Sequence, residues 1–150
     1  MYKIIITWDS SKHFENAIKE YEKRLGKNLE IIKLKPVKTW TWNQIIEKET
    51  QNLIKILEKQ KGFKIVLNPF WTNFSTQEFY EFIEQKKQNF SNIIFIIGWA
   101  LGLDYKKLKI YTDFEFSLWK LTMPHLLALL VLLEQIYRLE MIKKWTSYDK

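Results

Sequence analysis

Cysteine is absent from this chain of 150 residues. Disulfide bridges, thiolate nucleophiles and zinc sites built on cysteine are therefore excluded. Histidine is almost as rare, since only His13 and His125 occur, and this scarcity argues against a histidine-rich metal centre. We expect no bound metal. The lack of cysteine is compatible with a reducing compartment, and we expect the protein to be cytoplasmic.

Long apolar stretches are also missing. The longest run, LLALLVLL at residues 126–133, is far shorter than the roughly 20 residues that a membrane-spanning helix needs. The first segment, MYKIIITWDSSK, lacks the basic region and the small-residue cleavage site of a signal peptide, and its pattern is that of a strand. We therefore expect a soluble protein that has no membrane partner.

Acidic residues are outnumbered by basic ones, 17 to 24, which gives a formal net charge of +7. This surplus suits a polyanionic partner such as RNA or DNA. Lysine and isoleucine are abundant while glycine is scarce, however, and an AT-rich genome alone can produce such a bias. The composition therefore leaves two interpretations open, a nucleic-acid-binding surface and a merely solvated one.

Hydrophobic periodicity predicts alternating strands and helices. Strands are expected at residues 2–8, 29–37, 63–69, 92–98 and 113–118, and helices at residues 10–26, 42–61, 75–88 and 124–144. Gly26 and Gly62 are expected to end the first two helices. Continuous apolar strands separated by helices indicate an α/β fold with a mostly parallel sheet and helices on both faces. Because no repeat or composition break divides the chain, we expect one domain over residues 1–150.

Three expected strand ends carry unusual residues, and ligands of open α/β sheets bind outside such ends. They are the segments LNP at residues 67–69, IIGWALGL at residues 96–103 and SLWKLTMPH at residues 117–125. Gly98 and Gly102 can allow a ligand to approach the backbone, or they can simply form the turn. Their spacing matches neither the dinucleotide-binding fingerprint nor a P-loop.

The last expected helix carries polar groups in an apolar setting. His125 lies in its first turn, where a packing role is more common than a ligand-binding one. Glu134 and Arg138 are four residues apart and can form an ion pair on one helix face. Gln135 and Tyr137 interrupt the leucine-rich pattern, which indicates burial against a second surface. That surface can be a homodimer partner or the core of the same chain.

Tryptophans occur in expected loops or at helix starts, at positions 40, 42 and 71. Exposed aromatic side chains among lysines can stack on unpaired bases, although packing of a loop against the core is the more common role. The sequence shows no Ser-His-Asp set, no pair of carboxylates suited to acid–base catalysis and no metal-ligand spacing.

Four segments resemble the ribosomal RNA large subunit methyltransferase H family. They are EYEKRL at 20–25, FIIGWALGL at 95–103, FSLWKLTMPH at 116–125 and LLEQIYR at 132–138, and their order and spacing follow the family pattern. The resemblance covers essentially the whole chain. It implies the SPOUT fold, an α/β sheet with a C-terminal trefoil knot, which is a rare exception to unknotted chains. It also implies a homodimer through the last helix, in which we expect Leu133 and Ile136 to contribute.

The same resemblance implies an activity. Members of the family transfer a methyl group from S-adenosyl-L-methionine to N3 of a pseudouridine in a 23S rRNA stem-loop on assembled ribosomes. The cofactor-binding positions carried over to this sequence are Leu67, Gly98, Leu118, Trp119, Lys120, Leu121, Thr122 and Met123. Tyr148 and Asp149 occupy the positions of the catalytic tail. His125, Arg138 and Lys150 are the candidates for contact with RNA.

Some positions depart from the family pattern. Trp99 stands where the family loop, IGG-x-x-G, has its second glycine, and Leu129 stands where the last helix usually has an arginine. The family tail, G-x-P-Y-H-[KR], reads WTSYDK at residues 145–150, so Asp149 replaces a histidine. Histidine exchanges protons near neutral pH, whereas an exposed aspartate is a weak base.

These departures leave two hypotheses. The first is a divergent methyltransferase that relies on proximity, the reactivity of the cofactor and Tyr148. The second is a catalytically inactive SPOUT-fold homologue that acts as an RNA-binding or structural homodimer.

Overall fold

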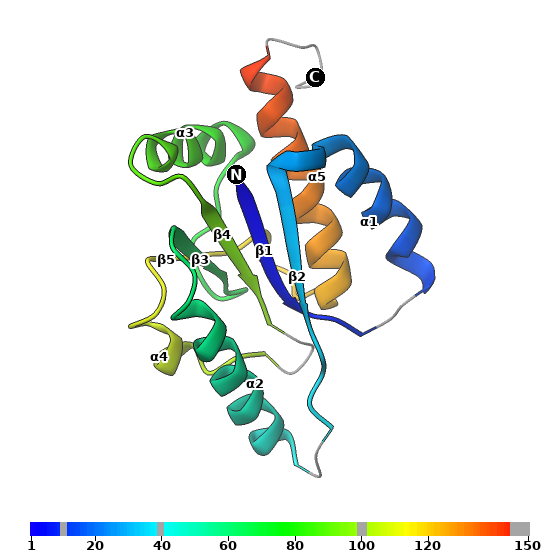
Figure 1. Cartoon of the computed structure of the whole chain (residues 1–150), viewed down its shortest axis with the longest axis vertical. Helices are drawn as coiled ribbons and strands as arrows, with labels where there is room; N and C mark the ends of the chain where they lie inside the picture. Colours follow the sequence, from blue (N-terminus) through cyan, green and yellow to red (C-terminus); the bar gives the residue numbers. More distant parts are fainter. Residues whose placement is uncertain (10–11, 39–40, 99–101, 145–150) are drawn as a thin grey trace.

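The computed structural model describes residues 1–9, 12–38, 41–98 and 102–144. Along these residues the chain alternates strands and helices, as Figure 1 shows. The elements are β1 (Tyr2–Thr7), α1 (Lys12–Leu25), the 3-10 turn η1 (Gly26–Asn28), β2 (Leu29–Leu34), α2 (Trp42–Leu57), β3 (Phe63–Leu67), α3 (Thr76–Lys87), β4 (Ile93–Ile97), α4 (Tyr105–Leu108), β5 (Phe114–Phe116) and α5 (His125–Lys143).

The strands form one sheet in the order β2-β1-β4-β3-β5, and every neighbouring pair is parallel. All five residues of β4, which lies at the centre, are buried. Such continuous apolar strands need cover on both faces. The predicted α/β fold with a parallel sheet is confirmed. Because the strands are parallel, the carboxyl ends of β3, β4 and β5 lie at one edge.

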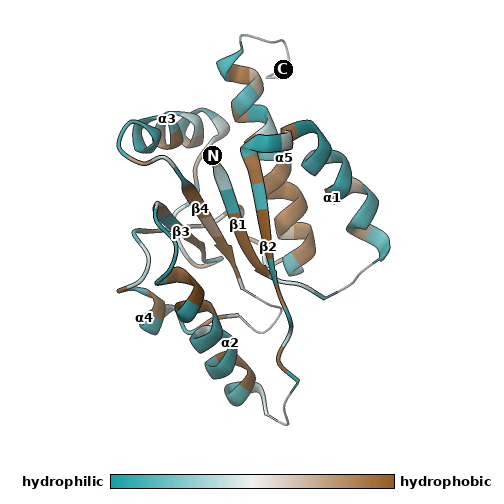
Figure 2. Cartoon of the chain, in the orientation of Figure 1, coloured by the Kyte–Doolittle hydropathy of each residue, from teal (hydrophilic) through white to brown (hydrophobic). Residues whose placement is uncertain are grey.

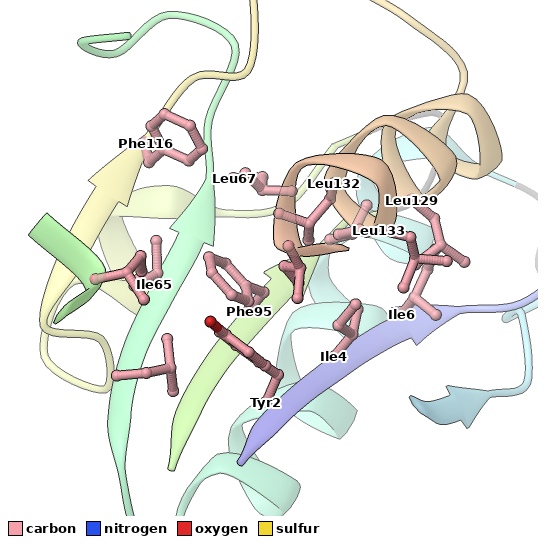
Figure 3. Packing of buried hydrophobic residues seen from close by; sticks show 14 of the residues in the cluster. Tyr2, Ile4, Ile6, Ile65, Leu67, Phe95, Phe116, Leu129, Leu132 and Leu133 are labelled. Atoms are coloured by element: carbon pink, nitrogen blue, oxygen red, sulfur yellow. The ribbon is translucent and has the colours of Figure 1, made fainter. Parts of the chain in front are cut away.

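Helices cover both faces of the sheet. One buried cluster joins β1, β3 and β4 to α1, α3 and α5, and Figure 3 shows part of it around Phe95 and Leu132. A second cluster joins the other face to α2 and α4. Successive residues of β1 serve the two clusters in turn, since Ile4 and Ile6 belong to the first and Ile5 to the second.

Helix α5 is a core helix of its own chain. Its buried residues are Leu126, Leu129, Leu132, Leu133, Ile136 and Leu139. Figure 2 shows hydrophobic colour along most of its length, whereas α1 and α2 carry extended hydrophilic faces. The expectation that Leu133 and Ile136 contribute to a dimer interface is wrong, because both are 0% exposed within one chain. The core interpretation of this apolar helix is confirmed.

Tyr2 ties the start of β1 to α5. Its ring is buried, and its hydroxyl donates to Glu140 Oε1 at 3.0 Å. Lys87 Nζ lies 3.0 Å from the same carboxylate oxygen and 3.0 Å from Glu84 Oε1. Burial, followed by the negative charge of Glu140, raises the pKa of Tyr2 far above its ordinary value. This group therefore anchors the C-terminal part of α5 at the edge where the strands begin.

The helix boundaries agree with the sequence in part. Gly26 follows α1 directly and has a φ of 52°, as expected for a glycine beyond a helix end. Helix α2, however, ends at Leu57 rather than at residue 61. Gly62 has a φ of 149°, and a Cβ there would lie 2.5 Å from the carbonyl oxygen of Asn92. This glycine permits close approach between the starts of β3 and β4, so its expected role as a helix terminator is wrong.

Candidate functional site

A cavity of about 160 Å³ lies at the carboxyl ends of β3, β4 and β5. A single buried water needs roughly 10–15 Å³ on the same measure, so the cavity has room for an organic ligand. Its lining comes from residues 67–69 after β3, from Ile97, Gly98 and Gly102, from most of residues 116–123, and from His125 and Ala128 of α5. This is the edge at which ligands of parallel α/β sheets bind.

The structure brings together most of the residues that the resemblance assigns to cofactor binding. Seven of the eight line the cavity: Leu67, Gly98, Leu118, Trp119, Leu121, Thr122 and Met123. The eighth, Lys120, is exposed and is not part of the lining. The arrangement of these residues around one cavity is thus established, while their contact with a cofactor stays a prediction.

Asn68 holds the segment after β3. It is only 6% exposed, and its Nδ2 donates to Glu115 Oε2 at 2.7 Å. Its Oδ1 accepts from the backbone N–H of Phe70 at 3.0 Å, and its own N–H donates to the carbonyl of Phe116 at 2.9 Å. Both ends of the side chain are therefore used to shape the cavity wall. Sequence reasoning placed Asn68 at this site but did not anticipate Glu115.

Ser117 joins the segments after β3 and β5. Its N–H donates to the carbonyl of Thr72 at 2.9 Å, and it forms a parallel bridge with Asn73. Its buried hydroxyl donates to the carbonyl of Trp119 at 2.7 Å and lies 3.4 Å from that of Pro69. The two walls of the cavity are thus braced against each other.

Contacts and backbone conformation within the protein explain why the two positions after β4 are glycines. A Cβ at Gly98 would lie 2.7 Å from Cγ of Leu103, which is nearly buried. Gly102 has a φ of 85°, a conformation that L side chains rarely adopt. Both glycines therefore have a structural reason, while close approach of a ligand to their backbone stays a prediction. Trp99 lies outside the described residues.

Tyr105 lines the cavity from α4, a four-residue helix that hydrophobic periodicity did not predict. Its hydroxyl donates to the carbonyl of Leu67 at 3.3 Å. Burial, and to a lesser extent the charge of Glu115, raises the pKa of Tyr105 to about 12. The phenol therefore stays protonated near neutral pH and acts as a donor. The one local signal for this helix is Asp104, whose Oδ1 accepts from the N–H of Lys107 at 3.1 Å.

His125 lines the cavity at the start of α5. Its two ring nitrogens are buried and have no hydrogen-bond partner within the described part of the chain. Burial lowers the pKa of His125, although the negative charge of Asp9 partly opposes this shift. The imidazole is therefore neutral near pH 7. Its contact with RNA stays a prediction.

The polar groups of α5 contact their own chain. The predicted pair is confirmed, since Arg138 and Glu134 Oε1 lie 2.7 Å apart. Gln135 Oε1 accepts from the hydroxyl of Thr76 at 3.2 Å, and Tyr137 meets the edge of Tyr21 with ring centroids 6.0 Å apart. Arg138 does not line the cavity, and the structure does not bring it together with the cofactor-binding candidates.

Two further parts of the family pattern, the arginine of the last helix and the C-terminal tail, are represented here by Leu129 and by residues 145–150. Leu129, where the resemblance expects an arginine, is 0% exposed and packs beside Leu133 in the core (Figure 3). Tyr148, Asp149 and Lys150 lie outside the described residues. Within residues 1–9, 12–38, 41–98 and 102–144, no cluster of three or more potential metal ligands occurs. None of the helices described there has the length and apolarity that a membrane crossing requires.

A family model described as "Predicted SPOUT methyltransferase" matches residues 2–149. The chain belongs to the SPOUT methyltransferase family. The sheet, the flanking helices and the cavity at the strand ends are consistent with a SPOUT methyltransferase. The trefoil knot stays a prediction, because residues 99–101, which follow β4, lie outside the described residues.

Curated relatives make the assignment more specific. The protein named Ribosomal RNA large subunit methyltransferase H of Streptococcus gordonii is 38% identical, and the match covers 93% of this chain and 92% of that protein. Proteins of the same name from Mycoplasma mycoides subsp. mycoides and Streptococcus suis are 37% and 36% identical over the same shares of each chain. The resemblance predicted from sequence segments is confirmed, and the chain is a SPOUT methyltransferase of this branch.

Proposed function

We propose that this protein methylates 23S rRNA in the cytoplasm, using S-adenosylmethionine as the methyl donor and N3 of a pseudouridine as the acceptor. The observation that carries this proposal is that seven of the positions matching the family's cofactor-binding residues line one cavity at the strand ends. The names of the curated relatives, which share more than a third of their residues with this chain, supply the substrate class.

The lining of the cavity suits the proposed cofactor. Leucine and methionine side chains offer an apolar surface for an adenine ring, and the main chain of residues 117–123 offers polar groups. Gly98 lines the cavity at the end of β4, and its missing side chain lets Leu103 pack against the backbone there. When bound, the cofactor supplies an electrophilic methyl group on a sulfonium. The lining residues would hold the cofactor and exclude water from its reactive centre.

Removal of the N3 proton requires a base, and the titratable groups that line the cavity among the described residues are Tyr105 and His125. The Tyr105 phenol stays protonated near neutral pH, and burial lowers the pKa of the His125 imidazole, which weakens it as a base. The remaining candidates are Tyr148 and Asp149, which the resemblance places in the catalytic tail. Tyr148 would orient the base of the substrate, and Asp149 would accept the proton in place of the family's histidine.

A homodimer is proposed for a geometric reason. Helix α5 starts at the cavity and runs to Lys143, roughly 27 Å along its axis. Figure 1 shows its end beyond the edge where β1 starts. Asp149 follows Lys144 by five residues, which span at most about 18 Å even when fully extended. Because this reach is shorter than α5, we propose that a second copy of the chain supplies the tail at the cavity.

The alternative is an inactive SPOUT-fold protein that binds RNA as a dimer. The replacement of the tail histidine by Asp149 favours it, because an aspartate retains little basicity near neutral pH. On this alternative the cavity binds no methyl donor, or binds it without transfer.

The test is calorimetric titration with S-adenosylmethionine and S-adenosylhomocysteine, followed by methyl transfer to ribosomes. Leu121→Arg places a cation at an exposed position of the lining, and Ile110→Arg is the matched control at an exposed position outside it. We expect one site per chain in the wild type and in Ile110→Arg, and at least a tenfold weaker affinity in Leu121→Arg. Equal affinities in both variants would place the cofactor elsewhere.

A further inference from the structure

Three aromatic side chains stand exposed on the two segments that form the cavity walls. Phe70 and Trp71, after β3, are 83% and 52% exposed, and Trp119, after β5, is 59% exposed. We call these three residues the aromatic rim. Trp119 lines the cavity, as does Pro69 beside Phe70. Large apolar side chains that gather on a surface in this way mark an interaction site.

Hydrogen bonds fix the backbone of the segments that carry the aromatic rim. The Ser117 hydroxyl donates to the carbonyl of Trp119, and the Ser117 N–H donates to the carbonyl of Thr72. The side-chain oxygen of Asn68 accepts from the N–H of Phe70. The backbones that carry the three rings are thus fixed relative to β3 and β5. Loops held in this way lose less conformational freedom when a partner binds, which reduces the entropic cost of binding.

The chemistry around the aromatic rim fits an unpaired nucleobase. Lys120 is exposed beside Trp119 and forms no ion pair with any residue in the described part of the chain. The whole chain carries a net charge of +7. Exposed aromatic rings next to cationic groups are the combination by which proteins bind unpaired nucleic acid, since rings stack on bases and cations pair with phosphates. A second copy of this chain at the aromatic rim is the alternative occupant, and the experiment below distinguishes it from RNA.

We propose that the aromatic rim is the platform on which the RNA substrate stacks its unpaired bases, with Trp119 against the base nearest the cavity. An RNA base must leave its helical stack before its edge can meet a methyl donor held in a cavity. The Trp119 ring at the mouth of the cavity would replace the lost base stacking and hold the base next to the cavity. This inference rests on the proposed function and names the residues that position its substrate.

The experiment measures initial rates of methyl transfer at saturating S-adenosylmethionine as the concentration of large ribosomal subunits is varied. The subunits come from a strain that lacks this gene. Trp119→Ala and Trp71→Ala should each raise KM roughly 5- to 150-fold, the range expected for loss of one base–aromatic stack. Trp119→Phe should restore most of the affinity. Trp42→Ala, at an exposed tryptophan outside the cavity lining, is the control and should leave KM unchanged.

A second readout separates stacking from charge and from the cofactor. In polarisation titrations with a labelled single-stranded RNA, Trp119→Ala should weaken binding without changing its dependence on salt, because stacking releases no counterions. Lys120→Ala should reduce that dependence. Calorimetry should show unchanged affinity for S-adenosylhomocysteine in Trp71→Ala.

Two results would overturn the proposal. One is an unchanged KM and RNA affinity in both Trp119→Ala and Trp71→Ala. The other is conversion of a dimer to monomers by either variant in sedimentation, which would assign the aromatic rim to a second copy. If the wild type binds RNA but transfers no methyl group, the proposed function fails, and the polarisation titrations still decide whether the aromatic rim stacks on RNA.

Discussion

Gly98→Ala is expected to destabilise the protein through a single steric contact. The added Cβ would lie 2.7 Å from Cγ of Leu103, closer than real Cβ atoms come, and 3.0 Å from Cδ1, so the leucine side chain must shift. Gly98 is not among the glycines with positive φ, so an alanine there meets no backbone strain. Overpacking of a core position costs about 1–3 kcal/mol, and we expect the free energy of unfolding to fall by that amount.

The reasoning is tested by a double-mutant cycle with Leu103→Ala. That change alone removes a nearly buried leucine and should cost about 2–5 kcal/mol. In the double variant the new Cβ at position 98 occupies space that the leucine has left. The loss of stability in the double variant should therefore be smaller than the sum of the two single-variant losses by about 0.5–3 kcal/mol. Urea unfolding followed by tryptophan fluorescence, at one chain concentration, measures all four proteins. If the two losses of unfolding free energy add strictly, the contact with Leu103 is not the cause of the destabilisation by Gly98→Ala.

Further predictions concern other parts of the fold. Ser75→Ala removes the capping box at the start of α3 and should lower the free energy of unfolding by about 1 kcal/mol. Tyr2→Phe removes the hydrogen bond that Glu140 accepts from the hydroxyl, while Lys87 still pairs with the same oxygen, so urea unfolding should show a loss of about 0.5–1.5 kcal/mol. Burial raises the pKa of Glu49, so its contribution to stability is present below the ordinary glutamate pKa and is lost as pH rises through the raised value. Glu49→Gln should therefore stabilise the protein near neutral pH and flatten this part of the pH dependence of unfolding; an identical profile would contradict the burial argument.

The sheet was predictable because its signal is continuous. Strands such as IIFII at residues 93–97 contain no polar residue, and a strand of this kind is stable only between two layers of helices. Gly26 was predictable for a local reason, the left-handed conformation beyond a helix end. Gly62 was not, because its neighbour is Asn92, 30 residues away, and no local pattern reports such a contact.

The candidate site was predictable as a set of strand ends but not as a set of contacts. The rule that ligands bind at these ends led to the segments at residues 67–69, 96–103 and 117–125, and the resemblance chose the individual residues within them. Tyr105 escaped prediction because a helix of four residues has no periodicity to detect. The burial of Leu133 likewise depends on which elements surround α5, which a hydrophobic helix pattern alone does not specify.

The central claim is methyl transfer to N3 of a pseudouridine in 23S rRNA, and mass spectrometry of the rRNA tests it directly. Large ribosomal subunits and whole ribosomes from a strain lacking this gene would be incubated with the purified protein and S-adenosylmethionine, and the 23S rRNA would then be digested and sequenced by mass. The account predicts that one pseudouridine-containing fragment gains the mass of a single methyl group, and that Leu121→Arg greatly reduces this gain. An rRNA left unchanged by a protein that is folded and binds S-adenosylmethionine would contradict it.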